Sequence, residues 1–119
     1  MLNVMTEFRK GILFVRPKGS LNKKNIEKFK DDVIPVVLKH GLKYVVVNLD
    51  KVNTIDLEGI ESLMELNEIV RELNGKTTLC SLTNSEVAST LRESSCTGSF
   101  YETSNELTAL GVMKLWEKK

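Results

Sequence analysis

The segment from residue 44 to residue 60, YVVVNLDKVNTIDLEGI, decides the fold. Its first part, residues 44–49, is apolar and β-branched almost without interruption, which is typical of a central strand covered by helices. A polar stretch follows, and from about Leu57 to Leu73 apolar residues recur at three- and four-residue spacing. This spacing predicts a helix. The residues expected to form its buried stripe are Ile60, Leu63, Met64, Val70 and Leu73.

The segment before this strand predicts a hairpin and a helix. Residues 2–9 and 12–17 flank a two-residue connection that ends in glycine, which is typical of a β-hairpin. Asn22 is the expected N-cap of the helix, Pro35 is expected to bend or break it, and Gly41 should end it. Its expected apolar stripe consists of Ile26, Phe29, Val33 and Val37.

The remaining chain continues the alternation of strands and helices. A strand is expected over 76–82, a helix over 85–94, a short edge strand over 99–101 and a final helix over 105–116. The predicted order is therefore β-β-α-β-α-β-α-β-α, an α/β fold with a mixed, mostly parallel sheet. With 119 residues and no linker-like segment, residues 1–119 are expected to form one domain.

Composition excludes several classes of partner. Lys and Arg number 17 against 16 Asp and Glu, so there is no overall basic field for nucleic acid. The apolar runs are far shorter than the ~20 residues of a membrane-spanning helix. We therefore expect a cytoplasmic protein with no direct nucleic-acid partner and no membrane insertion.

The motifs of catalysis and cofactor binding are missing from the sequence. It has no phosphate-binding glycine loop, a single histidine, His40, and two cysteines, Cys80 and Cys96, without metal-ligand spacing. His40 is better explained by the end of a helix, where a cation is favourable. Asp50 and Asp56 could suggest metal or acid–base chemistry, but Asp56 is well placed to cap a helix. The sequence therefore predicts no enzyme, no cofactor and no metal site.

The start of the helix at Leu57 is the most informative position. Free backbone amides and the helix dipole favour an anionic group there, and Glu58 supplies one. The acidic residues that follow at helical spacing are Glu61, Glu65, Glu68 and Glu72. This stripe is either a solvated acidic face or a docking edge that begins at Glu58.

Four short motifs, in this order and spacing, resemble the STAS domain of anti-sigma factor antagonists. They are VRPKGSLN at 15–22, VVNLD at 46–50, IDLEGI at 55–60 and NGK at 74–76. The resemblance covers essentially the whole chain. It implies a module that binds an anti-sigma factor, a protein with a histidine-kinase-like ATPase domain, and is released when a hydroxyl residue is phosphorylated.

In the family pattern that hydroxyl residue precedes a glycine. Asp56 matches the motif aspartate, Gly59 the motif glycine and Ile60 the motif leucine, while Asn22 stands at the usual aspartate of the first loop. The resemblance implies a partner-binding surface formed by Ser20, Asn22, Asp56, Leu57, Glu58, Gly59, Ile60, Glu61 and Glu65.

The chain departs from this pattern at the hydroxyl positions, which are Leu57 and Glu58. Glu58 accepts no phosphate ester, and its single charge imitates a phosphoserine imperfectly. Either the module binds without switching, or it is held in the released state towards a kinase and serves another partner. Thr54 and Ser62 are the alternative phosphorylation sites. A scaffold role in a sensory or transporter-associated assembly is the second function class, and an enzyme or nucleotide-binding protein, without a supporting motif, is the third.

Overall fold

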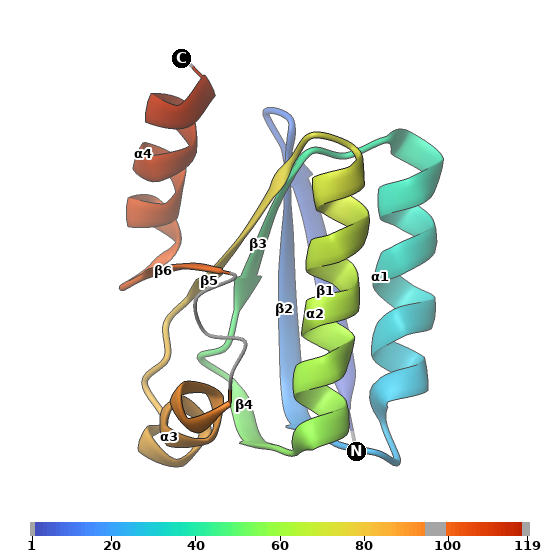
Figure 1. The fold of residues 1–119 in the computed structure, drawn as a ribbon, viewed down its shortest axis with the longest axis vertical. Coiled ribbons are helices and arrows are strands. Elements are labelled where there is room, and N and C mark those ends of the chain that lie inside the picture. Colours follow the sequence, from blue (N-terminus) through green and yellow to red (C-terminus); the bar gives the residue numbers. More distant parts are fainter. Residues whose placement is uncertain (1, 95–99, 118–119) are drawn as a thin grey trace.

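The computed structural model describes residues 2–94 and 100–117, which form one six-stranded sheet with helices on both sides (Figure 1). The elements in chain order are β1 (Asn3–Arg9), β2 (Ile12–Leu21), α1 (Ile26–His40), β3 (Tyr44–Asn48), β4 (Val52–Ile55), α2 (Leu57–Glu72), β5 (Lys76–Cys80), α3 (Ser85–Glu93), β6 (Tyr101–Thr103) and α4 (Glu106–Glu117). The α/β class is confirmed. None of the helices in this part of the chain is long and apolar enough to cross a membrane.

The sheet has the mixed, mostly parallel arrangement that the sequence predicts. Its strand order is β1-β2-β3-β5-β6, with β4 paired to the far end of β2. Among the strand pairs of the described residues, only β1–β2 is antiparallel. Lys10 and Gly11 form its turn with φ of 51° and 83°, the left-handed conformation that a two-residue hairpin requires.

β4 is an element that the predicted order lacks. It pairs with β2 through Gly19↔Val52, Ser20↔Thr54 and Leu21↔Ile55, with a register shift between Gly19 and Ser20. Only its first and last residues are buried, so its sequence has no strand-like alternation. The strand exists because β2 is long enough to pair first with β3 and then with β4. This pairing between distant segments leaves no local signal in the sequence of β4.

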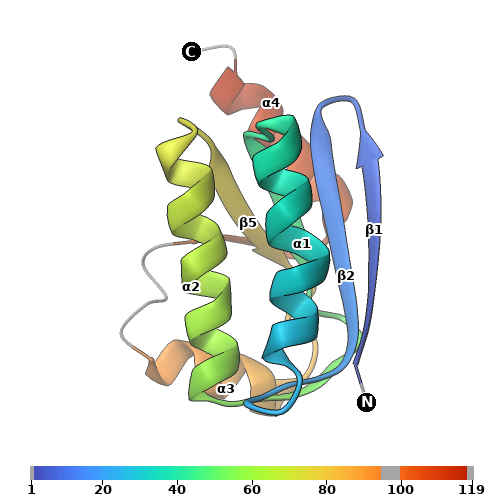
Figure 2. The ribbon, with the colours of Figure 1, turned by 90° about the vertical axis from the view of Figure 1, so that its right-hand side faces the viewer.

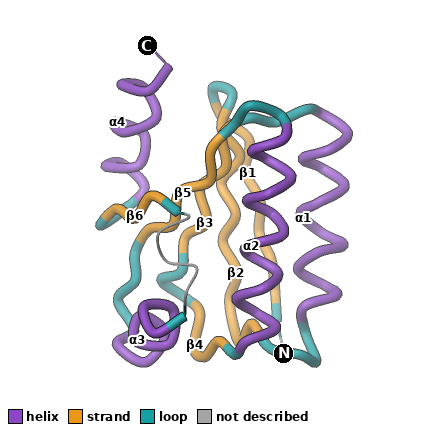
Figure 3. Tube along the Cα trace, viewed as in Figure 1, coloured by secondary structure: helices purple, strands orange, loops and turns teal. Residues whose placement is uncertain are grey.

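The two faces of the sheet carry different layers. α1 and α2 lie side by side on one face, and α4 lies on the other (Figures 2 and 3). Alternate strand residues point to each side: Leu13 and Val45 enter the large core under α1 and α2, whereas Phe14 and Val46 form a small cluster with Ala109 of α4. The main core therefore fixes α1 and α2, and little apolar surface fixes α4.

The start of α1 differs from the prediction by one turn. The helix begins after Asn25, which makes no side-chain capping bond. The Asn22 side chain instead accepts hydrogen bonds from the amides of Lys24 and Asn25, at 3.0 and 3.2 Å, within the preceding turn. The expected N-cap role of Asn22 is therefore wrong, because this turn leads into the helix without being part of it.

Of the bend or break expected at Pro35, the break is wrong, since α1 continues from Ile26 to His40 with Pro35 inside it. Pro35 and Asp31 are both exposed. The Asp31 carbonyl, which loses its amide partner to the proline ring, can therefore be hydrated by solvent. Gly41 ends the helix in the left-handed conformation, at φ 57°, as expected.

In the rest of the chain the predicted elements are present with small shifts. β5 ends at Cys80 rather than residue 82, because Ser81 has a φ of 58°. Met64 is 38% exposed, so its expected place in the buried stripe of α2 is wrong. Cys80 is buried as expected, while Cys96 and the start of the strand expected over 99–101 lie outside the described residues.

Candidate functional site

Asp56 connects the first loop of the chain to the start of α2. One carboxylate oxygen accepts a hydrogen bond from the Gly59 amide at 2.9 Å, which is the expected helix cap. The other accepts from the Lys23 amide at 3.0 Å. The Asp56 amide in turn donates to the carbonyl of Leu21 at 3.1 Å. A single side chain therefore holds the loop after β2 and the first turn of α2 in one fixed arrangement.

Gly59 brings the backbone of α2 against the end of β2. A Cβ atom at this position would lie 2.2 Å from the carbonyl oxygen of Leu21 and 2.9 Å from the Ile55 side chain. No side chain larger than hydrogen fits without displacing the backbone. The glycine in the 55–60 motif thus sets the height of the α2 N-terminus above the sheet, and with it the position of residues 57 and 58.

Leu57 and Glu58 stand on this first turn where solvent reaches them. Leu57 is 64% exposed, which is unusual for a large apolar side chain, and Glu58 is partly exposed. Beside them, Thr54 Oγ1 donates to Ser20 Oγ at 2.9 Å, and this hydroxyl pair joins β4 to β2. The surface therefore combines one apolar side chain, one carboxylate and two hydroxyls.

A shallow hollow of about 250 Å³ adjoins Leu57 and separates α2 from α3. Leu57 and Ile60 line it from the side of α2, and Thr90, Glu93 and Ser94 line it from the side of α3. Sequence reasoning did not place α3 at this site. No motif marks these three residues, and only the packing of α3 near β4 brings them to Leu57.

Three of the predicted site residues have no side chain available to a partner. Gly59 and Ile60 are buried, and Ile60 belongs to the main core. Ser62, an alternative phosphorylation site, is 1% exposed and donates to the Gly59 carbonyl at 2.6 Å. Thr54 is exposed, so of the two alternative hydroxyls it is the one that solvent reaches.

The acidic stripe of α2 is exposed but partly neutralised. Glu65 lies 3.5 Å from the ammonium group of Lys30 on α1, and Glu68 lies 3.3 Å from Arg71. Among the described residues, Glu58, Glu61 and Glu72 have no ion pair. Glu58 and Glu61 lie in the first two turns of α2, beside Asp56, and Glu72 lies at the other end of the helix.

Asp50 and Asp56 make separate structural contacts. Asp50 accepts a hydrogen bond from Thr83 at 3.1 Å, whereas both oxygens of Asp56 accept backbone amides. Within residues 2–94 and 100–117, no group of three His, Cys, Asp or Glu side chains has the spacing of a metal site.

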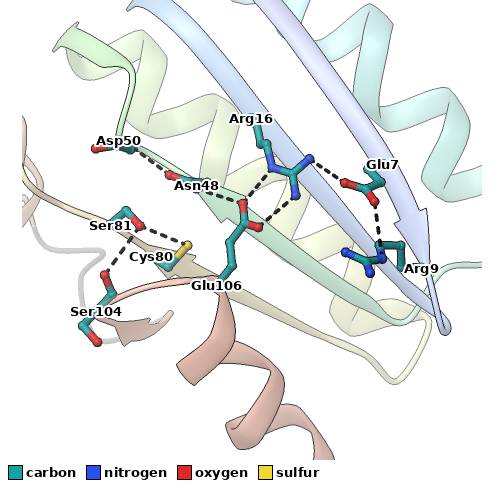
Figure 4. A network of polar contacts seen from close by, with 9 residues as sticks. All are labelled: Glu7, Arg9, Arg16, Asn48, Asp50, Cys80, Ser81, Ser104 and Glu106. Atoms are coloured by element: carbon teal, nitrogen blue, oxygen red, sulfur yellow. Dashed lines mark hydrogen bonds and ion pairs between the residues drawn. The ribbon is translucent and has the colours of Figure 1, made fainter.

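A second polar cluster holds α4 on the opposite face of the sheet (Figure 4). Arg16 makes two hydrogen bonds of 2.8 Å to the carboxylate of Glu106 and one of 2.8 Å to Glu7. Asn48 also donates to Glu106 at 2.8 Å. These bonds, chiefly those from Arg16, hold the pKa of Glu106 below its ordinary value, and burial raises the pKa of the nearby Cys80 thiol. The cluster joins residues 90 positions apart, and no spacing in the sequence indicates it.

Solved structures of proteins with different roles have the same fold as this chain. An anti-sigma factor antagonist from Mycobacterium paratuberculosis superposes with a TM-score of 0.86 at 14% identity, covering 96% of this chain and 95% of that one. A serine-to-glutamate variant of RsbS from Moorella thermoacetica gives 0.81 at 13% identity and covers 98% of each chain. A murine Solute Carrier 26 family anion transporter gives 0.74 at 16% identity, covering 92% of this chain but 18% of the transporter. At sequence identities this low, the structural similarity shows a shared fold alone.

The sequence itself matches the family model described as STAS domain over residues 3–109. This range includes the hairpin, the Asp56–Gly59 turn and the start of α4 with Glu106 and Ala109. The match extends over more than half of the chain, and its structural neighbours include anti-sigma factor antagonists. This chain is therefore a member of the STAS domain family.

Proposed function

We propose that this chain is a cytoplasmic protein-binding module of the anti-sigma factor antagonist type, which regulates transcription by binding a partner rather than by catalysing a reaction. Its partner-binding surface is the first turn of α2 with the adjacent loop after β2. The observation that carries the proposal is the position of Glu58, one residue before the Gly59 contact and two after the Asp56 cap. This is the position at which the family pattern has its phosphate-accepting hydroxyl.

A carboxylate at this position reproduces part of the charge of the phosphorylated state. Glu58 adds about one negative charge where a phosphoserine adds about 1.5 to 2, and the helix N-terminus stabilises such a charge by about 0.3–1 kcal/mol. The serine-to-glutamate variant of RsbS has the same fold, which is consistent with a glutamate in such a module. We propose that Glu58 gives the chain the binding preference of a permanently modified protein.

The exposed groups define the chemistry of the partner. Glu58 and Glu61 require a cationic surface, and Leu57 with the hollow beside α3 requires apolar side chains. The proposed partner is a sigma-regulating protein with a histidine-kinase-like ATPase domain. Among the predicted contact residues, Ser20, Asn22, Leu57, Glu58 and Glu61 have groups near the surface, while Asp56, Gly59 and Ile60 position them.

The test begins with an affinity pull-down from native cytosol and continues with binding measurements on the recovered partner. Glu58→Ser and Glu58→Gln should change the affinity by about 2–5 kcal/mol, the range for a charge at a desolvated contact. Glu72→Gln is the matched control, because it removes the same charge from the exposed last turn of the same helix. Equal affinities for wild type and both Glu58 variants would contradict the proposal.

A second candidate function is a non-switching interaction module within a sensory or transporter-associated assembly. The similarity to the transporter segment favours it, because that segment is a STAS-like fold within a larger protein. The two functions differ in what the pull-down yields. Recovery of an ATPase-domain partner that transfers phosphate from ATP to the Glu58→Ser variant supports the first, and recovery of a sensor or transporter without such transfer supports the second.

A further inference from the structure

The outer edge of β1 has free backbone groups arranged to pair with another strand. β1 is the first strand in the sheet order, and among the described elements only β2 pairs with it. Seven residues from Asn3 to Arg9 are extended along this edge, and Figure 2 shows β1 at the margin of the sheet. An unpaired edge of this length is a template for strand addition.

The hairpin register identifies which groups are free. The two-residue turn makes Arg9 and Ile12 a hydrogen-bonded pair, and bonded and non-bonded pairs alternate along an antiparallel ladder. The amides and carbonyls of Val4, Thr6 and Phe8 therefore point outward. Pro17, which has no amide hydrogen, lies opposite Val4, as this alternation requires.

An apolar groove of about 460 Å³ lies beside the same edge, between β1 and α1. Phe8 is 58% exposed at its rim, although it points to the same side of the sheet as the buried Leu13. The residues that line the groove are Thr6, Phe8, Leu13, Val36, His40 and Leu42. An added strand would thus gain both backbone hydrogen bonds and apolar contacts.

We propose that this edge pairs with the same edge of a second copy of the chain, with β1 antiparallel to β1 about a two-fold axis at Thr6. In this register the outward groups of Thr6 bond to those of Thr6 in the second copy. Val4 and Phe8 bond in the same way to Phe8 and Val4 of that copy. All seven residues of β1 are paired, and each Phe8 lies across from a Val4 on the side of the grooves.

The charges of β1 favour a second copy in this register. Glu7 lies opposite Met5 of the second copy, and Arg9 lies opposite Asn3, so no charge directly faces a like charge. An axis at Glu7 would set two carboxylates face to face, which is destabilising. Each Glu7 also remains neutralised within its own chain by Arg16 at 2.8 Å and Arg9 at 3.4 Å.

The pairing leaves the proposed partner-binding surface open. α1 packs against both β1 and α2, and therefore separates the edge from the first turn of α2 (Figure 2). The dimer would present two copies of the surface around Glu58. This inference does not depend on what that surface binds.

Sedimentation equilibrium from micromolar to millimolar concentration tests the proposal. Wild type should form a dimer, and Thr6→Pro should weaken it at least about tenfold, because it removes the two central amide donors. Thr6→Pro spares the β1–β2 ladder, since the Thr6 amide points outward, and an edge strand tolerates proline. Thr6→Val keeps the amide and is the matched control, which should dimerise like wild type.

Amide hydrogen exchange of the unaltered chain gives a second measurement that needs no variant. The amides of Thr6 and Phe8 should gain protection as concentration rises, whereas those of Met5 and Glu7 are already protected by β2. A monomer throughout the concentration range overturns the proposal. So does a dimer that Thr6→Pro leaves intact, or outward amides whose exchange is independent of concentration.

Discussion

α2 and α4 lie on opposite faces of one sheet and are attached to it by different physical means. α2 lies over the main core, with Gly59 in backbone contact with β2 and Asp56 capping its start. α4 meets the sheet through Ala109, a few apolar neighbours and the bonds of Glu106 to Arg16 and Asn48. Close packing tolerates almost no change of shape, whereas an ion-pair attachment depends on charge and therefore on pH.

The largest expected effect is on the free energy of unfolding when a methyl group is added at Gly59 of α2. The same change at Gly111 of α4 should have a small, opposite effect. Gly59→Ala should destabilise the protein by about 2–3 kcal/mol, because its Cβ would lie 2.2 Å from a backbone oxygen. At Gly111 in α4, no atom of the described part of the chain lies within 4 Å of the new Cβ. Gly111→Ala should therefore stabilise by up to about 1 kcal/mol through helix propensity. Urea unfolding measures the change in unfolding free energy for each variant. Equal changes for the two variants would contradict this prediction.

Removing the cap of α2 should have the next largest effect. Asp56→Ala leaves the amides of Gly59 and Lys23 without their acceptor and should cost about 1–2 kcal/mol. Asp31→Ala, at an exposed position in α1, is the control and should stay within about 0.5 kcal/mol. If thermal unfolding shows the same loss of stability for both variants, Asp56 does not connect the loop after β2 to the first turn of α2.

The attachment of α4 should be weaker than that of α2. Glu106→Gln keeps the shape of the side chain but removes its charge, and should cost about 1 kcal/mol, since both partners are partly exposed to solvent. Glu102→Gln breaks a more exposed ion pair with Arg92 and should cost less than about 0.5 kcal/mol. Comparable losses in chemical denaturation would show that the Arg16 cluster adds nothing beyond a surface ion pair.

The stability that Glu106 contributes to the attachment of α4 should depend on pH. The pKa of Glu106 is lowered in the folded protein from its ordinary value of 4.5, so the unfolded chain binds the proton more readily. This stabilisation is fully present above pH 4.5 and decreases as the pH falls through the lowered value. The difference in unfolding free energy between wild type and Glu106→Gln should shrink over that range. A difference that is constant from neutral pH to pH 3 would contradict this account.

Much of the fold could be predicted because its signals are local. The run at 44–49, the spacing of apolar residues in α1 and α2, and the turn at Lys10-Gly11 each lie within a short window. β4 and the course of α1 through Pro35 could not be predicted in this way. β4 exists through its pairing with β2, and Pro35 is tolerated because it faces solvent.

In the candidate site, too, contacts between neighbours in sequence could be predicted and contacts between distant segments could not. The 55–60 motif placed Asp56, Leu57, Glu58 and Gly59 together at the start of a helix, because they are adjacent in sequence. The contact of Asp56 with the Lys23 amide and the α3 side of the hollow were not predicted. Lys23 lies 33 positions from Asp56 in sequence, and the α3 residues are at least as far from Leu57, so these groups meet only after the sheet has formed.

The sequence by itself determined the α/β class, the helix cap at Asp56 and the presence of a carboxylate where the family pattern has a hydroxyl. Periodicity, capping and residue identity are properties of short segments, and they need no knowledge of distant contacts. Only the tertiary structure decided that Gly59 lies against Leu21, that Ser62 is buried and that Arg16 reaches Glu106. Those relations depend on how β2 is placed between two layers of helices, and that placement is settled by the packing of the whole chain.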